Sequence, residues 1–182
     1  DTPARRKGRL GHLAGLERDL FRKSIAVWEG GRKQGKAFDA FEEANAGREV
    51  LSQKELDEIN LMAAMVRTDP AAKKYLTGGS AEVTATWTRD VKHPDGSATV
   101  TVKCKGRLDY VAQAVVDLKT TRDASPDGFA REAWRYGYHT QAAWYVDGYA
   151  AATGRELPAV LIAVESEAPH VVAVYRIPDD IL

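Results

Sequence analysis

The chain has 182 residues, a length typical of one domain, and its 44% hydrophobic and 29% charged residues are those of an ordinary folded protein. No apolar run approaches the ~18 residues that a membrane span needs, and no signal-peptide pattern opens the chain. The one cysteine, Cys104, excludes an internal disulfide and a multi-cysteine zinc site, and it fits a reducing cytoplasm.

The first 76 residues are predicted to be helical. Leucines spaced three and four apart predict a helix over 9–21, and a break rich in glycine and lysine follows around 30–35. Further helices are expected over 36–46, from a Ser52 cap with Glu55 at its capping-box position to about residue 67, and from 70 to the glycines at 78 and 79.

The pattern changes to strands after residue 79. Strands are expected over 80–88, 97–105, 107–110, 114–119, 159–165 and 170–177, with a hairpin turn at Asp95-Gly96 and helices over 127–134 and 138–152. This order predicts an α+β or mixed α/β fold. We expect a single domain over 1–182, with a mainly helical part over 1–79 and a sheet core over 80–182.

Charge is balanced overall but unevenly distributed. The 26 Lys+Arg residues equal the 26 Asp+Glu residues, which at first argues against a nucleic-acid partner. Residues 1–36 hold ten basic and four acidic side chains, a net charge of +6, so the rest of the chain carries −6. A solvated face explains most such runs. The functional alternative is a basic arm that holds phosphates beside an acidic centre that holds metal.

The most informative segment is predicted to be a hairpin that turns at Gln113. Asp109 and Asp117 lie four residues on either side of this centre and would face each other across the ladder, with Cβ atoms about 4.5–5.5 Å apart. Lys119 would project from the same face as Asp117. Two carboxylates this close repel each other, and a divalent cation such as Mg²⁺ or Mn²⁺ relieves the repulsion. A surface salt-bridge cluster is the alternative, and a slip of one residue would send Asp109 to the opposite face.

These residues carry a resemblance to a known superfamily. The segments G-R-L-D at 106–109 and V-D-L-K-T-T at 116–121 resemble the PD-(D/E)XK nuclease signature, and more specifically that of the exodeoxyribonuclease VIII (RecE-like) branch, phage-type recombination exonucleases related to RecB-like and lambda-type nuclease domains. Three further matches are Ala81-Glu82-Val83, a Tyr138-His139-x-Gln141-x-x-x-Tyr145 helix and an early Gly8-x-x-x-His12 helix followed by Glu17. The resemblance implies a central mixed β-sheet flanked by helices, with a helical N-terminal segment.

The resemblance also implies a role for each matched residue. The metal ligands would be Asp109, Asp117, the backbone carbonyl of Leu118, Glu82 and His12, holding Mg²⁺ or Mn²⁺, with two ions per site. Lys119 would position and activate the attacking water, while Gln141 and Tyr145 would hold the hairpin and contact DNA. The basic residues Arg5, Arg6, Lys7 and Arg9 would guide the phosphate backbone.

The implied activity is a metal-dependent 5′-to-3′ exonuclease that acts on double-stranded DNA ends in recombination. Its implied partners are a single-strand annealing protein and further copies of the chain in a ring, with no membrane. A RecB- or Cas4-like nuclease of other polarity, an endonuclease, and a non-catalytic DNA-binding or assembly module on the same fold are the alternatives. The iron–sulfur cluster common in Cas4-like proteins needs more than one cysteine.

Overall fold

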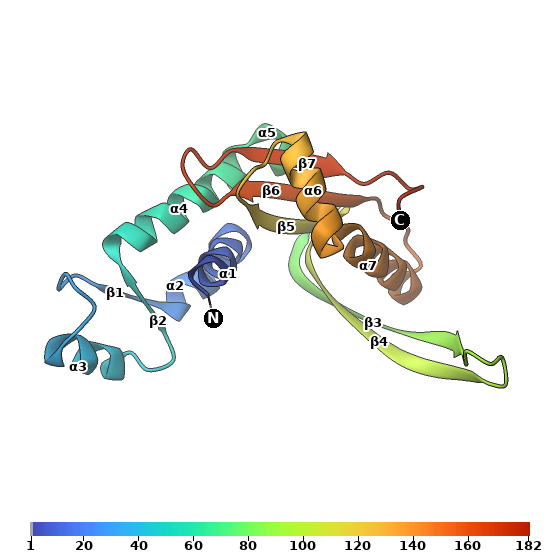
Figure 1. The fold of residues 1–182 in the computed structure, drawn as a ribbon, viewed down its shortest axis with the longest axis horizontal. Coiled ribbons are helices and arrows are strands. Elements are labelled where there is room, and N and C mark those ends of the chain that lie inside the picture. The colour runs from blue at the N-terminus through green and yellow to red at the C-terminus, as the bar shows by residue number, and fades with distance from the viewer. Residues whose placement is uncertain (1) are drawn as a thin grey trace.

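A five-stranded mixed sheet forms the centre of the molecule, and helices pack on both of its faces (Figure 1). The computed structural model describes residues 2–182. The helices are α1 (Pro3–Leu16), α2 (Arg18–Ser24), α3 (Lys36–Ala44), α4 (Gln53–Thr68), α5 (Pro70–Tyr75), α6 (Pro126–Tyr136) and α7 (Tyr138–Thr153). The strands are β1 (Ile25–Trp28), β2 (Glu49–Ser52), β3 (Ser80–Lys92), β4 (Thr99–Val111), β5 (Val115–Thr121), β6 (Ala159–Glu165) and β7 (Val172–Arg176). The mixed α/β fold expected from the sequence is confirmed.

The sheet has the order β3-β4-β5-β6-β7, and only the β5–β6 pair is parallel. Strand β6 is buried along almost its whole length because both of its faces are covered. Ile162 and its neighbours pack against Met62 and Val66 of α4, while Leu161 faces Phe129 of α6 on the other side. These two apolar layers fix the position of β5, the strand that carries Asp117 and Lys119.

The N-terminal part departs from the expected run of helices in two places. The first helix ends at Leu16 and a second, α2, begins at Arg18. Two four-residue strands, β1 and β2, pair in parallel in a separate small sheet that the helical pattern did not predict. The α4 cap agrees with the sequence, since the Ser52 side chain accepts from the Glu55 amide and the Glu55 carboxylate accepts from the Ser52 amide.

The β3–β4 hairpin is long and projects away from the body of the molecule (Figure 1). The sequence predicted a break between 105 and 107, but β4 is continuous from Thr99 to Val111. Gly106 lies inside this strand because α7 packs closely there: a Cβ atom at Gly106 would lie 3.3 Å from the Tyr145 ring. No helix among the described residues is long and apolar enough to cross a membrane.

Candidate metal and catalytic centre

Three neighbouring strands bring three carboxylates to one level of the sheet. The β4–β5 turn has the register predicted from its centre at Gln113, with Val111 opposite Val115 and Tyr110 opposite Val116. Asp109 and Asp117 are the next residues beyond the last of these pairs. On the other side of β4, the pairs that flank Glu82 place it level with Asp109. The acids expected to cluster therefore lie in a row across β3, β4 and β5.

Asp117 is the buried member of this row, with 4% of its surface exposed. Burial and the nearby charge of Asp109 raise the pKa of the Asp117 carboxyl to about 6, although Lys119 opposes the shift. The Oδ2 atom of Asp117 lies 2.5 Å from Lys119 Nζ, yet it accepts no hydrogen bond of regular geometry. The adjacent Asp109 uses its Oδ2 to accept from the Leu118 amide at 2.8 Å. A buried carboxylate with unmet acceptor capacity suits a bound cation.

His12 reaches this row from α1. Its Nε2 lies 3.0 Å from Asp109 Oδ2 and its Nδ1 lies 3.5 Å from Glu82 Oε1. Burial acts to lower the pKa of His12, but the hydrogen bond with Asp109 and the surrounding acidic charges raise it above its ordinary value. One ligand atom from each of these three residues fits within a 4.8 Å cluster. The structure therefore places His12 beside Glu82 and Asp109, and its role as a metal ligand stays a prediction.

Glycines let α1 approach the sheet closely enough to deliver His12. A Cβ atom on Gly8 would lie 3.6 Å from the Thr120 side chain, and one on Gly15 would lie 3.4 Å from Leu118. Both glycines therefore lie directly against β5. Distances of 3.4–3.6 Å are ordinary van der Waals contacts, so α1 lies against β5 with no space left for a side chain much larger than alanine at these two positions.

Glu82 has an unusual backbone for a strand residue. Its φ is 54°, in the left-handed region, which costs a non-glycine residue about 1–3 kcal/mol. The Glu82 carboxylate accepts a short hydrogen bond from Arg107 Nε and faces His12 with its other oxygen. Strain of this kind is held in place by surrounding contacts and is concentrated at functional sites.

Lys119 is held by a chain of polar contacts from α7. Its Nζ donates to Gln141 Oε1 at 2.8 Å, and Gln141 Nε2 donates to the Tyr145 hydroxyl at 2.9 Å. The same Nζ lies 4.6 Å from the centre of the Tyr138 ring, a contact that was not among the sequence-based expectations. Gln141 and Tyr145 thus touch the centre through Lys119, four residues apart on one helix face.

The donor set fits a divalent cation. Three carboxylates offer hard oxygen ligands of the kind that Mg²⁺ and Mn²⁺ take, and His12 adds one nitrogen. His12, Glu82 and Asp109 are the described side chains whose ligand atoms lie close enough together to hold such an ion. Asp117 lies outside this group, and its role as a ligand stays a prediction. The Leu118 carbonyl, expected from the resemblance to be a further ligand, stays a prediction.

The basic residues of α1 have partners within the protein. Arg6 donates to Glu49 at 2.6 Å, to Glu55 at 2.8 Å and to the Val50 carbonyl at 2.9 Å. These contacts tie α1 to β2 and to the start of α4. The Arg6 side chain is therefore engaged in holding elements together.

The other basic residues near Arg6 differ in their ion pairs and in their exposure. Arg9 pairs with Glu49 at 2.5 Å, and Lys7 pairs with Glu58 at 3.3 Å. Arg5 is exposed on the first turn of the helix. The assignment of these residues to DNA binding stays a prediction.

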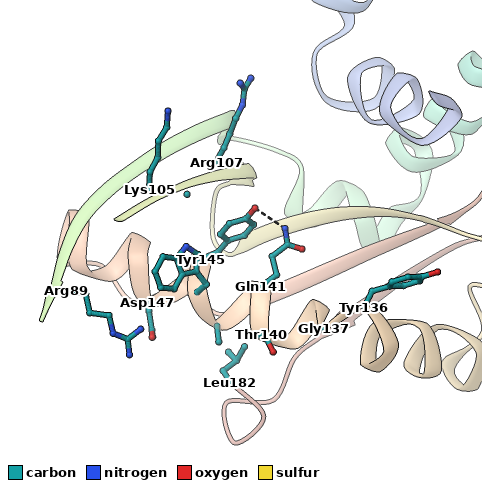
Figure 2. A pocket seen from close by; sticks show the side chains of 13 residues that line it. Arg89, Lys105, Arg107, Tyr136, Gly137, Thr140, Gln141, Tyr145, Asp147 and Leu182 are labelled. Atoms are coloured by element: carbon teal, nitrogen blue, oxygen red, sulfur yellow. Dashed lines mark hydrogen bonds between the residues drawn. The ribbon is translucent and has the colours of Figure 1, made fainter. Parts of the chain in front are cut away.

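An open cleft of about 880 Å³ lies between the β3–β4 hairpin and α7 (Figure 2). Gln141 and Tyr145 line it from the helix, and Arg89, Lys105 and Arg107 line it from the hairpin. The sequence reasoning did not select these three basic residues. For Lys105 and Arg107 the available signal was the alternation of basic residues with apolar or small ones just before Asp109, whereas Arg89 on β3 had no such signal.

The comparison with family models matches the whole chain, residues 1–182, to the description "PDDEXK-like domain of unknown function (DUF3799)". The chain belongs to this PDDEXK-like family. The superfamily expected from the G-R-L-D and V-D-L-K-T-T motifs is thereby confirmed. No curated protein matches the sequence.

Two solved structures are similar to this chain. One is the crystal structure of a protein from Eubacterium rectale described as a candidate exonuclease, with 20% sequence identity and a TM-score of 0.55 over 80% of this chain. The match covers 55% of that protein, so this PDDEXK-like chain spans about half of its length. Another, the protein named SSO0001, has 17% identity and a TM-score of 0.39, with 68% of this chain and 50% of that chain covered.

Proposed function

We propose that this PDDEXK-like domain is a metal-dependent nuclease that hydrolyses DNA phosphodiester bonds. The observation that carries the proposal is the row of Glu82, Asp109 and Asp117, which His12 and Lys119 complete. Repulsion between acids is tolerated here at a buried position, where a structural role alone would favour neutral side chains. The family membership and the fold support the same reaction class.

Each side chain has a role that its contacts allow. When bound by the carboxylates and His12, Mg²⁺ or Mn²⁺ would lower the pKa of water and neutralise phosphate charge. Lys119 has three N–H donors, of which one is used by Gln141 and one points toward Asp117. The third donor can orient the attacking water or a phosphate oxygen.

The finer assignment rests on the resemblance to RecE-like exonucleases. We infer a 5′-to-3′ exonuclease that acts on double-stranded DNA ends with two Mg²⁺ or Mn²⁺ ions and serves recombination in a bacterial or phage-infected cytoplasm. A ring of identical subunits and a single-strand annealing partner belong to the same proposal. RecB-like polarity or an endonuclease mode would use the same carboxylates and lysine.

The test compares linear duplex DNA labelled at each end with closed circular DNA, in Mg²⁺, in Mn²⁺ and in EDTA. We expect the linear duplex to be degraded from its 5′ ends in metal only. Cutting of the circle would replace the exonuclease assignment by an endonuclease, and release of the 3′ label first would reverse the polarity. Absence of cleavage in both metals, with DNA still bound, would leave a non-catalytic module.

Two variants locate the activity. Lys119→Ala is expected to lower the cleavage rate by at least about 100-fold, as removal of a group that stabilises the transition state does. Lys54→Ala removes an exposed lysine on α4 and is the matched control, with the wild-type rate expected. Circular dichroism spectra of both variants show whether they fold like the wild type.

A further inference from the structure

We propose that the exposed face of the β3–β4 hairpin is a track that holds the DNA backbone and leads it to the carboxylates. The track consists of Lys103, Lys105 and Arg107 on β4 and the threonines that face them on β3. This inference rests on the proposed nuclease function but uses residues outside the catalytic centre, apart from Arg107, which also contacts Glu82.

Strand alternation divides β4 into two rows. Cys104, Gly106 and Leu108 are buried, whereas Lys103, Lys105 and Arg107 are exposed. Figure 2 shows Lys105 and Arg107 projecting to one side of the strand, with the ring of Tyr145 on the other side. Lys105 and Arg107 border the cleft between the hairpin and α7, but their side chains project away from it in Figure 2, so the basic row occupies the opposite, free face of the hairpin.

Helix α7 decides which face of the hairpin is free. The rings of Trp87 on β3 and Trp144 on α7 lie 4.9 Å apart, and Tyr145 packs against Gly106. Because α7 covers one face of the hairpin through these contacts, the opposite face is exposed to solvent. A surface of this kind can carry a ligand without a change in the fold.

The basic row ends at the proposed metal site. Arg107 is two residues before Asp109 on β4, and its partner Thr84 is two residues after Glu82 on β3. At about 3.4 Å per residue, Lys103 lies roughly 20 Å along the strand from Asp109. A backbone bound along the track would thus continue directly into the centre.

The chemistry of the track suits phosphate. Lys103 lies opposite Thr88, and Lys105 lies opposite Thr86, so each cation has a hydroxyl beside it. Lysine and threonine side chains both contact phosphate oxygens, and neither reads base identity in doing so. Successive lysines on one strand face are about 6.7 Å apart, similar to the separation of successive phosphates along a DNA strand.

The two lysines also lack internal partners, unlike the basic residues of α1. Among residues 2–182, no carboxylate lies within ion-pair distance of Lys103 or Lys105. Unpaired cations aligned on an exposed strand raise the local positive potential and favour an extended polyanion. Of the anionic partners available to a nuclease domain, the DNA backbone is the one that must also reach Asp109.

The experiment measures binding, separately from cleavage. The Lys103→Gln/Lys105→Gln variant and the wild type are titrated with a fluorescein-labelled 30-base-pair duplex in EDTA, at several salt concentrations. Loss of two phosphate contacts is expected to weaken binding at least about tenfold at low salt and to reduce the slope of log K against log salt by about two. The Lys54→Gln/Lys73→Gln variant removes the same charge from α4 and α5 and is expected to bind like the wild type.

The outcomes separate the track from the nuclease assignment. Equal affinity and slope for the track variant and the wild type would overturn the track, whatever the cleavage results. An equal loss in the α4 and α5 control would also overturn it, because the effect would then follow net charge and not position. If the wild type cleaves nothing in Mg²⁺ or Mn²⁺ but the track variant alone loses DNA binding, the track stands and the nuclease proposal fails.

Discussion

Asp117 combines burial with a charge that the protein alone does not fully compensate. Its pKa of about 6 arises from burial first and from Asp109 second, so at neutral pH the ionised carboxylate opposes folding. Because the pKa of Asp117 is higher in the folded protein, its ionised carboxylate lowers the free energy of unfolding when the pH is above about 6. This cost disappears when the pH falls below 3.8, the ordinary value for an Asp carboxyl. A cation at this position would offset the cost. The free energy of unfolding should therefore increase when metal binds.

We predict that Mn²⁺ or Mg²⁺ stabilises the wild type but not Asp117→Asn. In EDTA at pH 7 the variant should be at least as stable as the wild type, with a gain of up to about 3 kcal/mol, because it removes a buried charge. At a metal concentration 100 times the dissociation constant, the wild type should gain about 2.7 kcal/mol. Urea unfolding with and without metal measures both effects. An equal metal response in the two proteins would contradict the role of Asp117 as a ligand.

A second prediction concerns Gln141 and Tyr145, which the proposed function assigns to the positioning of Lys119. Gln141→Ala removes the acceptor of Lys119 and should lower kcat about tenfold with little change in KM, because the lysine loses its fixed orientation. Tyr145→Phe removes only the hydroxyl behind Gln141 and should have a smaller effect.

The control for this prediction is the Lys119→Ala background. If Gln141 acts through the lysine, Gln141→Ala should add little there, since effects of residues that act as a unit are not additive. An undiminished loss in that background would show that Gln141 contacts the substrate independently. Steady-state kinetics on linear duplex DNA give the effect of Gln141→Ala on kcat and KM in the wild type and in the Lys119→Ala background.

The elements could be predicted from sequence where their signals are local. The α4 cap depends on Ser52 and Glu55 alone, and the register of the β4–β5 hairpin follows from its centre at Gln113. Both agree with the structure. The pairing of β1 with β2 joins segments more than twenty residues apart and depends on packing under α1 and α4, so no local pattern shows it.

Two features of the site were beyond sequence reasoning for the same reason. Gly106 looked like an interruption between strands, but its role is to admit the Tyr145 ring against a continuous β4. The basic residues of α1 are expected to contact phosphate, a prediction that stays open, but the sequence does not show that Arg6 also binds carboxylates of β2 and α4. In both cases the deciding neighbour is distant in the chain.

At the scale of elements, Glu55 joins α1, α4 and the loop before α3. Burial acts to raise its pKa, but hydrogen bonds from Lys33, the Ser52 amide and Arg6 lower it to about 2. A lowered carboxyl pKa stabilises the fold above the ordinary value of 4.5, and this contribution is lost as the pH falls toward 2.

We predict that Glu55→Gln lowers the free energy of unfolding by about 1–2 kcal/mol at pH 7, a value reduced from the full shift because the side chain is 36% exposed. The difference from the wild type should shrink between pH 5 and pH 3. Urea unfolding at a series of pH values tests this. The exposed Glu43→Gln on α3 is the control, and a pH-independent difference for Glu55→Gln would contradict the ionic origin of the effect.

At the scale of the whole molecule, the formal net charge is zero, but a positive and a negative region lie next to each other. The basic row on β4 attracts a polyanion, whereas Glu82, Asp109 and Asp117 at its end repel one until cations are bound. The balance of 26 basic and 26 acidic residues is therefore a poor guide to DNA binding. Whether cations occupy the acidic centre should matter more.

We predict from these two regions that divalent metal strengthens DNA binding itself, before any cleavage. With the Lys119→Ala variant, the affinity for a linear duplex should rise about tenfold on replacing EDTA by Ca²⁺ or Mn²⁺ at constant ionic strength, because cations cancel the repulsion between carboxylates and phosphate. Adding Glu82→Gln and Asp109→Asn should raise the affinity in EDTA and abolish the response to metal. Fluorescence anisotropy measures all four states, with Lys54→Ala added to Lys119→Ala as the control for the extra substitutions. Equal dissociation constants with and without metal would show that the acidic centre lies away from the bound phosphates.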